Sequence, residues 1–138
     1  MNISHIEHIG IAVKNLKEAI KFYEEVLDFK CYAIEEVKDQ QVRTAFFQVG
    51  QTKIELLEAT SEESPIYKFI EKRGEGIHHI AFNVNSVQSS LDEAEKKGVK
   101  LIDKQPRKGA EGLNIAFLHP KSTHGLLIEF CSKEDPEK

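Results

Sequence analysis

The chain has 138 residues, of which 40% are hydrophobic and 30% charged, and its net charge is −4. These values are ordinary for a soluble globular protein, and the length predicts a single domain, residues 1–138. Charges of both signs are mixed along the sequence, which argues against nucleic-acid binding, and the longest apolar runs are too short to cross a bilayer. Without the pattern of a signal peptide, we expect a cytoplasmic protein in which Cys31 and Cys131 are reduced thiols.

The first half of the chain predicts one strand, one helix and three more strands. Residues 5–13 form an apolar run typical of a buried strand, and apolar residues at helical spacing follow over 16–27. Asn15 is a suitable N-cap for that helix, with Glu18 placed to complete a capping box. The three strand-like runs that come next are 30–37, 41–49 and 52–58.

A short helix over about 64–73 is predicted to join this half to the second. Ser64 is a good N-cap, Pro65 suits the first helical turn, and Gly74 ends the pattern. The second half repeats the order of elements, with Gly98 expected just after its helix. Its expected elements are a strand at 77–84, a helix at 87–97, strands near 100–103, 113–119 and 125–131, and a frayed tail from 133 to 138.

The two halves are copies of one unit. His79 follows His8, and Val84 follows Val13, by the same 71 residues, and each histidine lies inside an apolar strand. An internal repeat determines the architecture, so we predict an α+β fold of two tandem βαβββ modules, about 5–58 and 76–131. One sheet face in each module would be covered by its helix. The other faces would then be buried against each other, around a metal-binding cleft, or against a partner chain.

A histidine and a glutamate recur in equivalent strands of the two copies. Glu55 lies in the last strand of the first copy and Glu129 in the last strand of the second, each between apolar neighbours. Two imidazoles and two carboxylates converging on one cleft would suit a divalent ion such as Mn, Co, Ni, Zn or Mg. Taken alone, a strand histidine is usually a core residue and a strand glutamate often faces solvent. The repetition of the whole set, His8 and Glu55 with His79 and Glu129, favours the metal site.

The remaining histidines are expected to have other places. His78 precedes His79 directly and should point to the opposite face of the strand, either in a structural role or as a support for the metal ligands. His5 and His124 have no counterpart in the repeat and are expected at the surface. His119 precedes a proline and is expected in a turn.

A small basic cluster precedes the loop 109–112. It contains Lys104, Arg107 and Lys108, and two readings are open for it. Such a cluster could meet phosphate groups, although an ordinary solvated surface is the favoured account.

The repeated unit with its two His/Glu pairs resembles the vicinal oxygen chelate superfamily, which includes glyoxalases, bleomycin-resistance proteins and dioxygenases. Within that superfamily, the stretches 64–82 and 119–129 are similar to the methylmalonyl-CoA epimerases. The first stretch contains Gly76-Ile77-His78-His79-Ile80-Ala81-Phe82 and the second begins His119-Pro120-Lys121-Ser122. The resemblance extends over about residues 5 to 131.

The resemblance implies a metal-dependent epimerase that interconverts the (R) and (S) epimers of methylmalonyl-CoA, an acyl-CoA substrate, through C2 proton abstraction and a metal-stabilised enolate. It implies a homodimer, His8, Glu55, His79 and Glu129 as the metal ligands, and Glu129 as the general base. Some relatives have a further carboxylate on the third strand, where Arg43 aligns here, with Thr44 beside it. Arginine is a poor general acid, so the second acid/base group stays open, with Glu55 one candidate.

Three other functions compete with this one. Glyoxalase I-type lactoylglutathione lyases have a similar shell, but usually with an Asp-Pro-Asp-Gly run where this chain has His119-Pro120-Lys121-Ser122. An extradiol dioxygenase would bind iron through two histidines and one glutamate, which leaves Glu55 without a role. Non-catalytic ligand-binding proteins of the same fold tend to lack the full metal set, which this chain retains.

Overall fold

The computed structural model describes residues 1–133, so the tail predicted to fray lies outside the described residues apart from Lys133. The chain forms two compact units. The N-terminal unit is His8–His78, and the C-terminal unit comprises Met1–Glu7 together with the chain from His79 onward. Within residues 1–133, no helix combines the length and the apolar character needed to cross a membrane.

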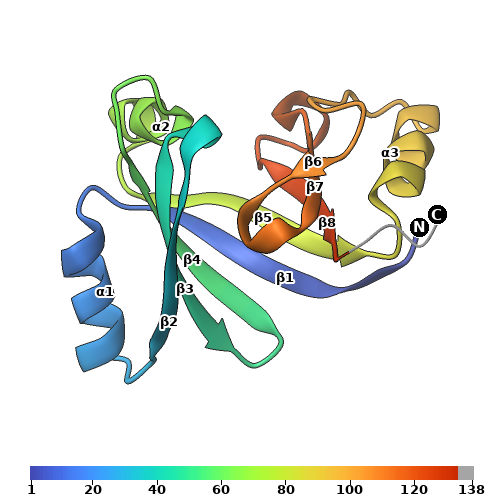
Figure 1. Ribbon diagram of the computed structural model, residues 1–138. Coiled ribbons are helices and arrows are strands. Elements are labelled where there is room, and N and C mark those ends of the chain that lie inside the picture. The colour runs from blue at the N-terminus through green and yellow to red at the C-terminus, as the bar shows by residue number, and fades with distance from the viewer. Residues whose placement is uncertain (134–138) are drawn as a thin grey trace. The chain divides into compact units, whose positions relative to one another are not determined.

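The N-terminal unit contains a four-stranded sheet with strand order β2-β3-β4-β1 (Figure 1). β4 is parallel to β1, and the other neighbouring pairs are antiparallel. Its elements are β1 (Ile3–Ala12, whose first five residues belong to the other unit), α1 (Leu16–Glu25), β2 (Cys31–Val37), β3 (Val42–Val49), β4 (Thr52–Ala59) and α2 (Pro65–Arg73).

The C-terminal unit repeats this topology with strand order β5-β8-β7-β6. Again the first and last strands of the copy, β5 and β8, are parallel, and the other pairs are antiparallel. Its elements are β5 (Gly76–Val84, whose first three residues belong to the N-terminal unit), α3 (Val87–Lys96), β6 (Arg107–Lys108), β7 (Asn114–Leu118) and β8 (Ile128–Ser132). The βαβββ order predicted for each copy is therefore confirmed.

One predicted strand is wrong. Residues 100–103 contribute only an isolated bridge, from Leu101 to Leu118, and the edge strand of this unit is β6 instead. The Phe117 N–H of β7 bonds to a side chain here and not to the backbone of a neighbouring strand: it donates to Oδ2 of Asp103 at 2.9 Å. A ladder bond is thereby replaced, and Pro106, which has no N–H, delays the return to strand geometry until Arg107.

Both predicted N-caps are formed, but within residues 1–133 the Glu18 carboxylate does not complete the capping box predicted with Asn15. The Glu18 N–H donates to Oδ1 of Asn15 at 3.0 Å, and the Ile66 N–H donates to Oγ of Ser64 at 3.1 Å. These bonds satisfy N–H groups that the first turn of a helix cannot pair internally. Gly98 has the left-handed φ of 88° expected after α3, although α1 ends at Glu25, two residues earlier than predicted.

In both units the helix covers one face of the sheet. The α1 residues Leu16 and Tyr23 pack on the buried side chains of Phe47 and Leu56, and burial raises the pKa of the Tyr23 phenol. In the C-terminal unit, Leu91 of α3 belongs to the corresponding core cluster. The members of that cluster are Val84, Val87, Leu91, Ala94, Ala116, Leu118 and Phe130. The opposite face of the N-terminal sheet contains a second apolar cluster, in which Val42 and Leu57 pack with Ile66 of α2, beside the polar residues described below.

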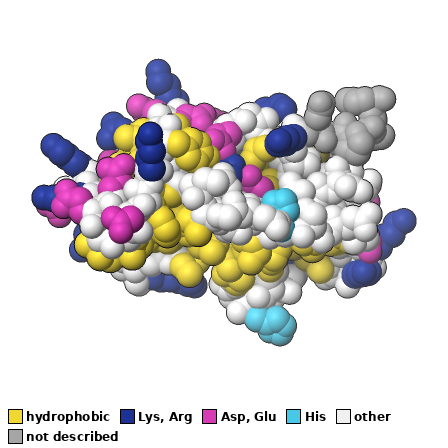
Figure 2. All heavy atoms as spheres, turned by 90° about the horizontal axis from the view of Figure 1, so that it is seen from below, with side chains coloured by type: hydrophobic (Ala, Val, Ile, Leu, Met, Phe, Trp, Pro, Cys, Tyr) yellow, Lys and Arg dark blue, Asp and Glu magenta, His cyan; other side chains and the backbone are white. Residues whose placement is uncertain are grey.

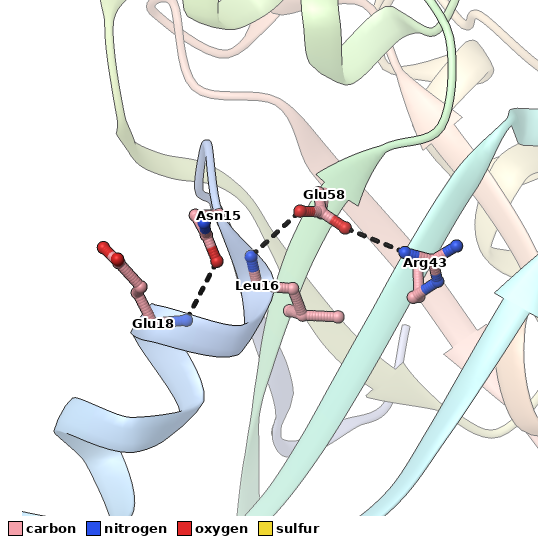
Figure 3. Close-up of polar contacts among 5 residues, drawn as sticks. All are labelled: Asn15, Leu16, Glu18, Arg43 and Glu58. Carbon is pink, nitrogen blue, oxygen red and sulfur yellow. Dashed lines mark hydrogen bonds and ion pairs between the residues drawn. The ribbon is translucent and has the colours of Figure 1, made fainter.

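Glu58 ties the start of α1 to the sheet (Figure 3). Its Oε2 accepts the Leu16 N–H at 3.0 Å, and its Oε1 pairs with Nη1 of Arg43 at 3.1 Å. A carboxylate at a helix N-terminus is favourable because it accepts an otherwise unpaired N–H and interacts with the positive end of the helix dipole.

We expect Glu58→Ala to lower the free energy of unfolding by about 1 kcal/mol, the usual cost of losing a helix cap. Arg43→Ala removes only the more exposed partner of the ion pair, so its cost should stay below about 0.5 kcal/mol. Urea denaturation of the two variants measures both values. Equal losses would show that the ion pair, and not the cap, carries the effect.

Candidate metal-binding and catalytic site

Strand register places His8 and Glu55 side by side in the N-terminal unit. Gly10 of β1 pairs with Glu55 of β4. Side chains two residues apart in a strand share a face, so His8 lies on the same face as Glu55. Gly10 has no side chain to separate them, and Nδ1 of His8 lies 3.4 Å from Oε2 of Glu55.

The C-terminal unit repeats this register. Ala81 of β5 pairs with Glu129 of β8, and Ala81 occupies the place that Gly10 has in the first copy. Nε2 of His79 lies 3.2 Å from Oε1 of Glu129. Both copies therefore pair a histidine with a glutamate, but through different ring nitrogens. His8 approaches its glutamate with Nδ1, and His79 does so with Nε2.

A phenylalanine stands opposite each glutamate on the third strand of its copy. Phe46 of β3 pairs with Glu55, and Phe117 of β7 pairs with Glu129. The Phe117 and His79 rings are nearly perpendicular, at 86°, with centroids 5.6 Å apart. This edge-to-face contact restricts the orientation of the His79 imidazole.

All four residues of the two His/Glu pairs are buried, with exposed fractions of 4% for His8, 4% for Glu55, 6% for His79 and 3% for Glu129. A buried carboxylate requires a compensating partner. Two ligand atoms about 2.0–2.2 Å from one ion lie roughly 2.8–3.6 Å apart at octahedral or tetrahedral angles. The separations of 3.4 and 3.2 Å therefore fit two neighbouring ligands of a divalent ion within each pair.

Arg43 does not lie on this face of the sheet. It follows the alternation of β3 to the face covered by α1, where it meets Glu58 (Figure 3). Thr44, fully buried beside it, lies on the face of Glu55 instead. The residues that β3 contributes to that face are Val42, Thr44, Phe46 and Gln48, none of them a carboxylate. The third strand thus offers no second acid/base group in this chain.

Lys53 lies on the face of Glu55 and was not singled out from the sequence. It is a buried lysine of β4, two residues before Glu55 and in register with His8. Its position before a strand glutamate was the available signal, because residues two apart share a face. The second copy has Leu127 in the corresponding place, so this buried strand lysine has no counterpart there.

Residues 7–117 match the family model described as the Glyoxalase/Bleomycin resistance protein/Dioxygenase superfamily. The chain belongs to this superfamily. The match confirms the resemblance to the vicinal oxygen chelate proteins, whose tandem βαβββ modules agree with the topology of both units.

Methylmalonyl-CoA epimerases are among the similar members of the superfamily. A solved methylmalonyl-CoA epimerase in complex with methylmalonyl-CoA and NH4+ is 36% identical, with a TM-score of 0.91 and 95% of each chain covered. The ethylmalonyl-CoA/methylmalonyl-CoA epimerase of Cereibacter sphaeroides is 36% identical over 129 residues, covering 92% of this chain and 96% of that protein. The Bacillus subtilis protein YqjC, which is uncharacterised, is 45% identical over 129 residues, covering 94% and 92%.

The remaining histidines of this superfamily member stand apart from the two pairs. His78 packs edge-on against the Phe69 ring, with centroids 4.9 Å apart. His119 accepts the Lys121 N–H through Nδ1 and so caps a turn, and His124 is exposed, both as predicted. His5 is half-buried beside Ser4 rather than fully at the surface.

Proposed function

We propose that the protein is a methylmalonyl-CoA epimerase that interconverts the (R) and (S) epimers of its acyl-CoA substrate. The observation that carries this proposal is the buried His/Glu pair, which recurs at the same strand register in both units. The epimerase found with methylmalonyl-CoA supports the choice of substrate, because its similarity extends along 95% of the chain.

His8, Glu55, His79 and Glu129 would together hold one divalent ion, with Co, Mn, Zn, Ni and Mg all compatible with this donor set. The two carboxylates would balance the charge of the dication, which makes burial of the group tolerable. A bound ion would supply Lewis-acid stabilisation of the negative charge that develops on the thioester oxygen when the C2 proton leaves.

Glu129 is the general base of the proposed reaction. A carboxylate has two oxygens, so Glu129 can act as a ligand through one of them and accept the C2 proton through the other. His79 beside Oε1 and Phe117 on the neighbouring strand hold the carboxylate in a fixed place. Proton return needs a second group, and Glu55, the counterpart of Glu129 in the first copy, is the candidate within the set.

Deuterium incorporation tests the reaction directly. Incubated with a divalent ion and methylmalonyl-CoA in heavy water, the protein should introduce deuterium at C2 and equilibrate the two epimers. Formation of lactoylglutathione from methylglyoxal and glutathione should be undetectable beside this turnover. The reverse ranking would assign a glyoxalase function, and binding of methylmalonyl-CoA without exchange would indicate a non-catalytic protein.

A homodimer and a cytoplasmic location stay predictions. Exposed hydrophobic side chains are present on the face shown in Figure 2. In the N-terminal unit, five of the exposed large apolar residues belong to α1, the turn after it and the edge strand β2: Phe22, Val26, Leu27, Tyr32 and Ile34. Burial of such residues would favour self-association. Sedimentation analysis that returned a monomer would contradict the homodimer.

A further inference from the structure

Arg107, the first residue of β6, is held in place from two sides. Its Nε donates to Oδ1 of Asp103 at 3.1 Å, and its Cζ lies 5.6 Å from the centroid of the Phe117 ring. The other oxygen of Asp103 accepts the Phe117 N–H. Asp103 and Phe117 are thus bonded to each other and both contact the guanidinium, which limits its rotation.

The terminal nitrogens of Arg107 are not used by these contacts. Within residues 1–133, the guanidinium hydrogen-bonds only through Nε, and the side chain is 35% exposed. Arginine binds carboxylates and phosphates through parallel N–H groups of its planar fork. An arginine that is already ordered loses less conformational freedom on binding an anion than a mobile one does.

Phe117 places this guanidinium next to the second His/Glu pair. The ring that lies under Arg107 also contacts His79 edge-on, and the Phe117 backbone pairs with Glu129. A single aromatic side chain therefore separates the arginine from the imidazole. An anionic group bound by Arg107 would lie beside the residues proposed to carry out the chemistry.

Arg107 differs from the two other members of the basic cluster. Lys108 donates to the Gly112 carbonyl oxygen at 3.4 Å, and Lys104 is exposed. Neither lysine has a described aromatic or carboxylate partner within residues 1–133. Only the arginine in this cluster is oriented by other side chains.

We propose that Arg107 is a substrate-binding residue that takes an anionic group of the acyl-CoA and orients it at the His79/Glu129 pair. The anion is either the carboxylate of the acyl group or a phosphate of coenzyme A, because both match the guanidinium fork. This inference rests on the proposed epimerase function. It assigns to Arg107 the binding of a substrate anion, a role that none of the four proposed metal ligands has.

The test compares Arg107→Gln with Lys104→Gln, which removes the same charge from the same basic cluster. For methylmalonyl-CoA, kcat/KM of Arg107→Gln should fall by roughly 10- to 100-fold, the usual effect of losing a hydrogen bond to a charged group. Lys104→Gln should stay within about twofold of the parent protein. If Arg107→Gln does not fold, Arg107→Lys replaces it, since the lysine keeps the charge but lacks the planar fork.

Two substrate analogues identify the anion. Methylmalonyl-pantetheine keeps the carboxylate and the thioester but has no phosphate, and propionyl-CoA keeps the phosphates but has no carboxylate. If Arg107 binds the carboxylate, its substitution lowers turnover of methylmalonyl-pantetheine and leaves the affinity for propionyl-CoA unchanged. If it binds a phosphate, turnover of methylmalonyl-pantetheine is unchanged and the affinity for propionyl-CoA falls.

A purely structural role gives a different pattern. Damage to the unit around Phe117 would weaken both analogues together and lower the melting temperature and the metal content, and that result overturns the inference. Arg107→Gln that behaves like Lys104→Gln on every substrate also overturns it, while the epimerase function stands. A parent protein that does not epimerise methylmalonyl-CoA overturns the proposed function and this inference with it.

Discussion

Glu129→Gln is expected to retain the metal and to lose epimerisation by roughly 10²–10⁴-fold, the usual contribution of a positioned general base. The glutamine keeps a carbonyl oxygen for the ion but cannot accept a proton. Its shape matches that of glutamate, so the pairing of β8 with Ala81 and Phe117 should survive. Steady-state turnover of each epimer measures the loss, and metal analysis with a thermal melt verifies that the site and the fold remain.

Glu55→Gln is the matched control for this prediction. It makes the same chemical change in the same register position of the other copy, where Gly10 replaces Ala81. Glu55 is a proposed ligand but not the proposed base, so we expect the milder effect. In heavy water, Glu129→Gln should lose C2 exchange from one epimer more severely than from the other, since one base serves one face of C2. Parent-like turnover by Glu129→Gln together with an inactive Glu55→Gln would place the base in the first copy.

The repeat made the topology and the His/Glu pairs predictable from sequence. The constant offset that relates His8 to His79 predicts the same strand order in both copies. The alternation of side chains along a strand then predicts which residues share a face. The structure bears this out in the pairing of each glutamate with a small residue, Gly10 or Ala81, two positions after the histidine. Small residues at these places leave room for the imidazole and the carboxylate to meet.

The third strand shows why the rest was less predictable. Arg43 and Thr44 are neighbours and point to opposite faces of the sheet. A shift of one residue in the alignment therefore decides whether the side chain faces α1 or lies on the face of Glu55. Only the pairing of Phe46 with Glu55 fixes which of them faces the candidate site. Lys53 was missed for a related reason, since a lysine in a strand is usually exposed and its burial depends on the neighbouring strands.

The edge strand of the second copy depended on tertiary contacts. Residues 100–103 have a strand-like pattern, but the Asp103 carboxylate takes the Phe117 N–H that a strand there would have paired. The same carboxylate holds Arg107, so the departure from the repeat coincides with the residue proposed to bind substrate. A side chain that replaces a ladder bond leaves little trace in hydrophobic periodicity, which reports burial and not hydrogen bonding.

Measurements of metal content should distinguish the roles of His78 and His79, the two adjacent histidines of β5. The protein is expected to bind about one divalent ion per chain, and His79→Ala should lower its affinity for the ion by about tenfold or more, the usual cost of losing a ligand or its support. His78→Ala should keep parent-like metal content, because His78 points to the opposite face of β5 from His79 and packs on Phe69. Elemental analysis after dialysis against metal-free buffer measures both variants.

The same comparison extends to the first copy. His8→Ala should lose the ion as His79→Ala does, since each histidine is one half of a buried His/Glu pair. Thermal melts of the three alanine variants show whether a loss of metal reflects unfolding. This control is needed because His79→Ala loses the ring contact with Phe117 and His78→Ala loses the ring contact with Phe69, and each loss weakens packing. Full occupancy in His79→Ala would remove this histidine from the ligand set. If His8→Ala alone lost the ion, the first pair would bind it without the second, and the repeat would record common ancestry and not a shared metal site.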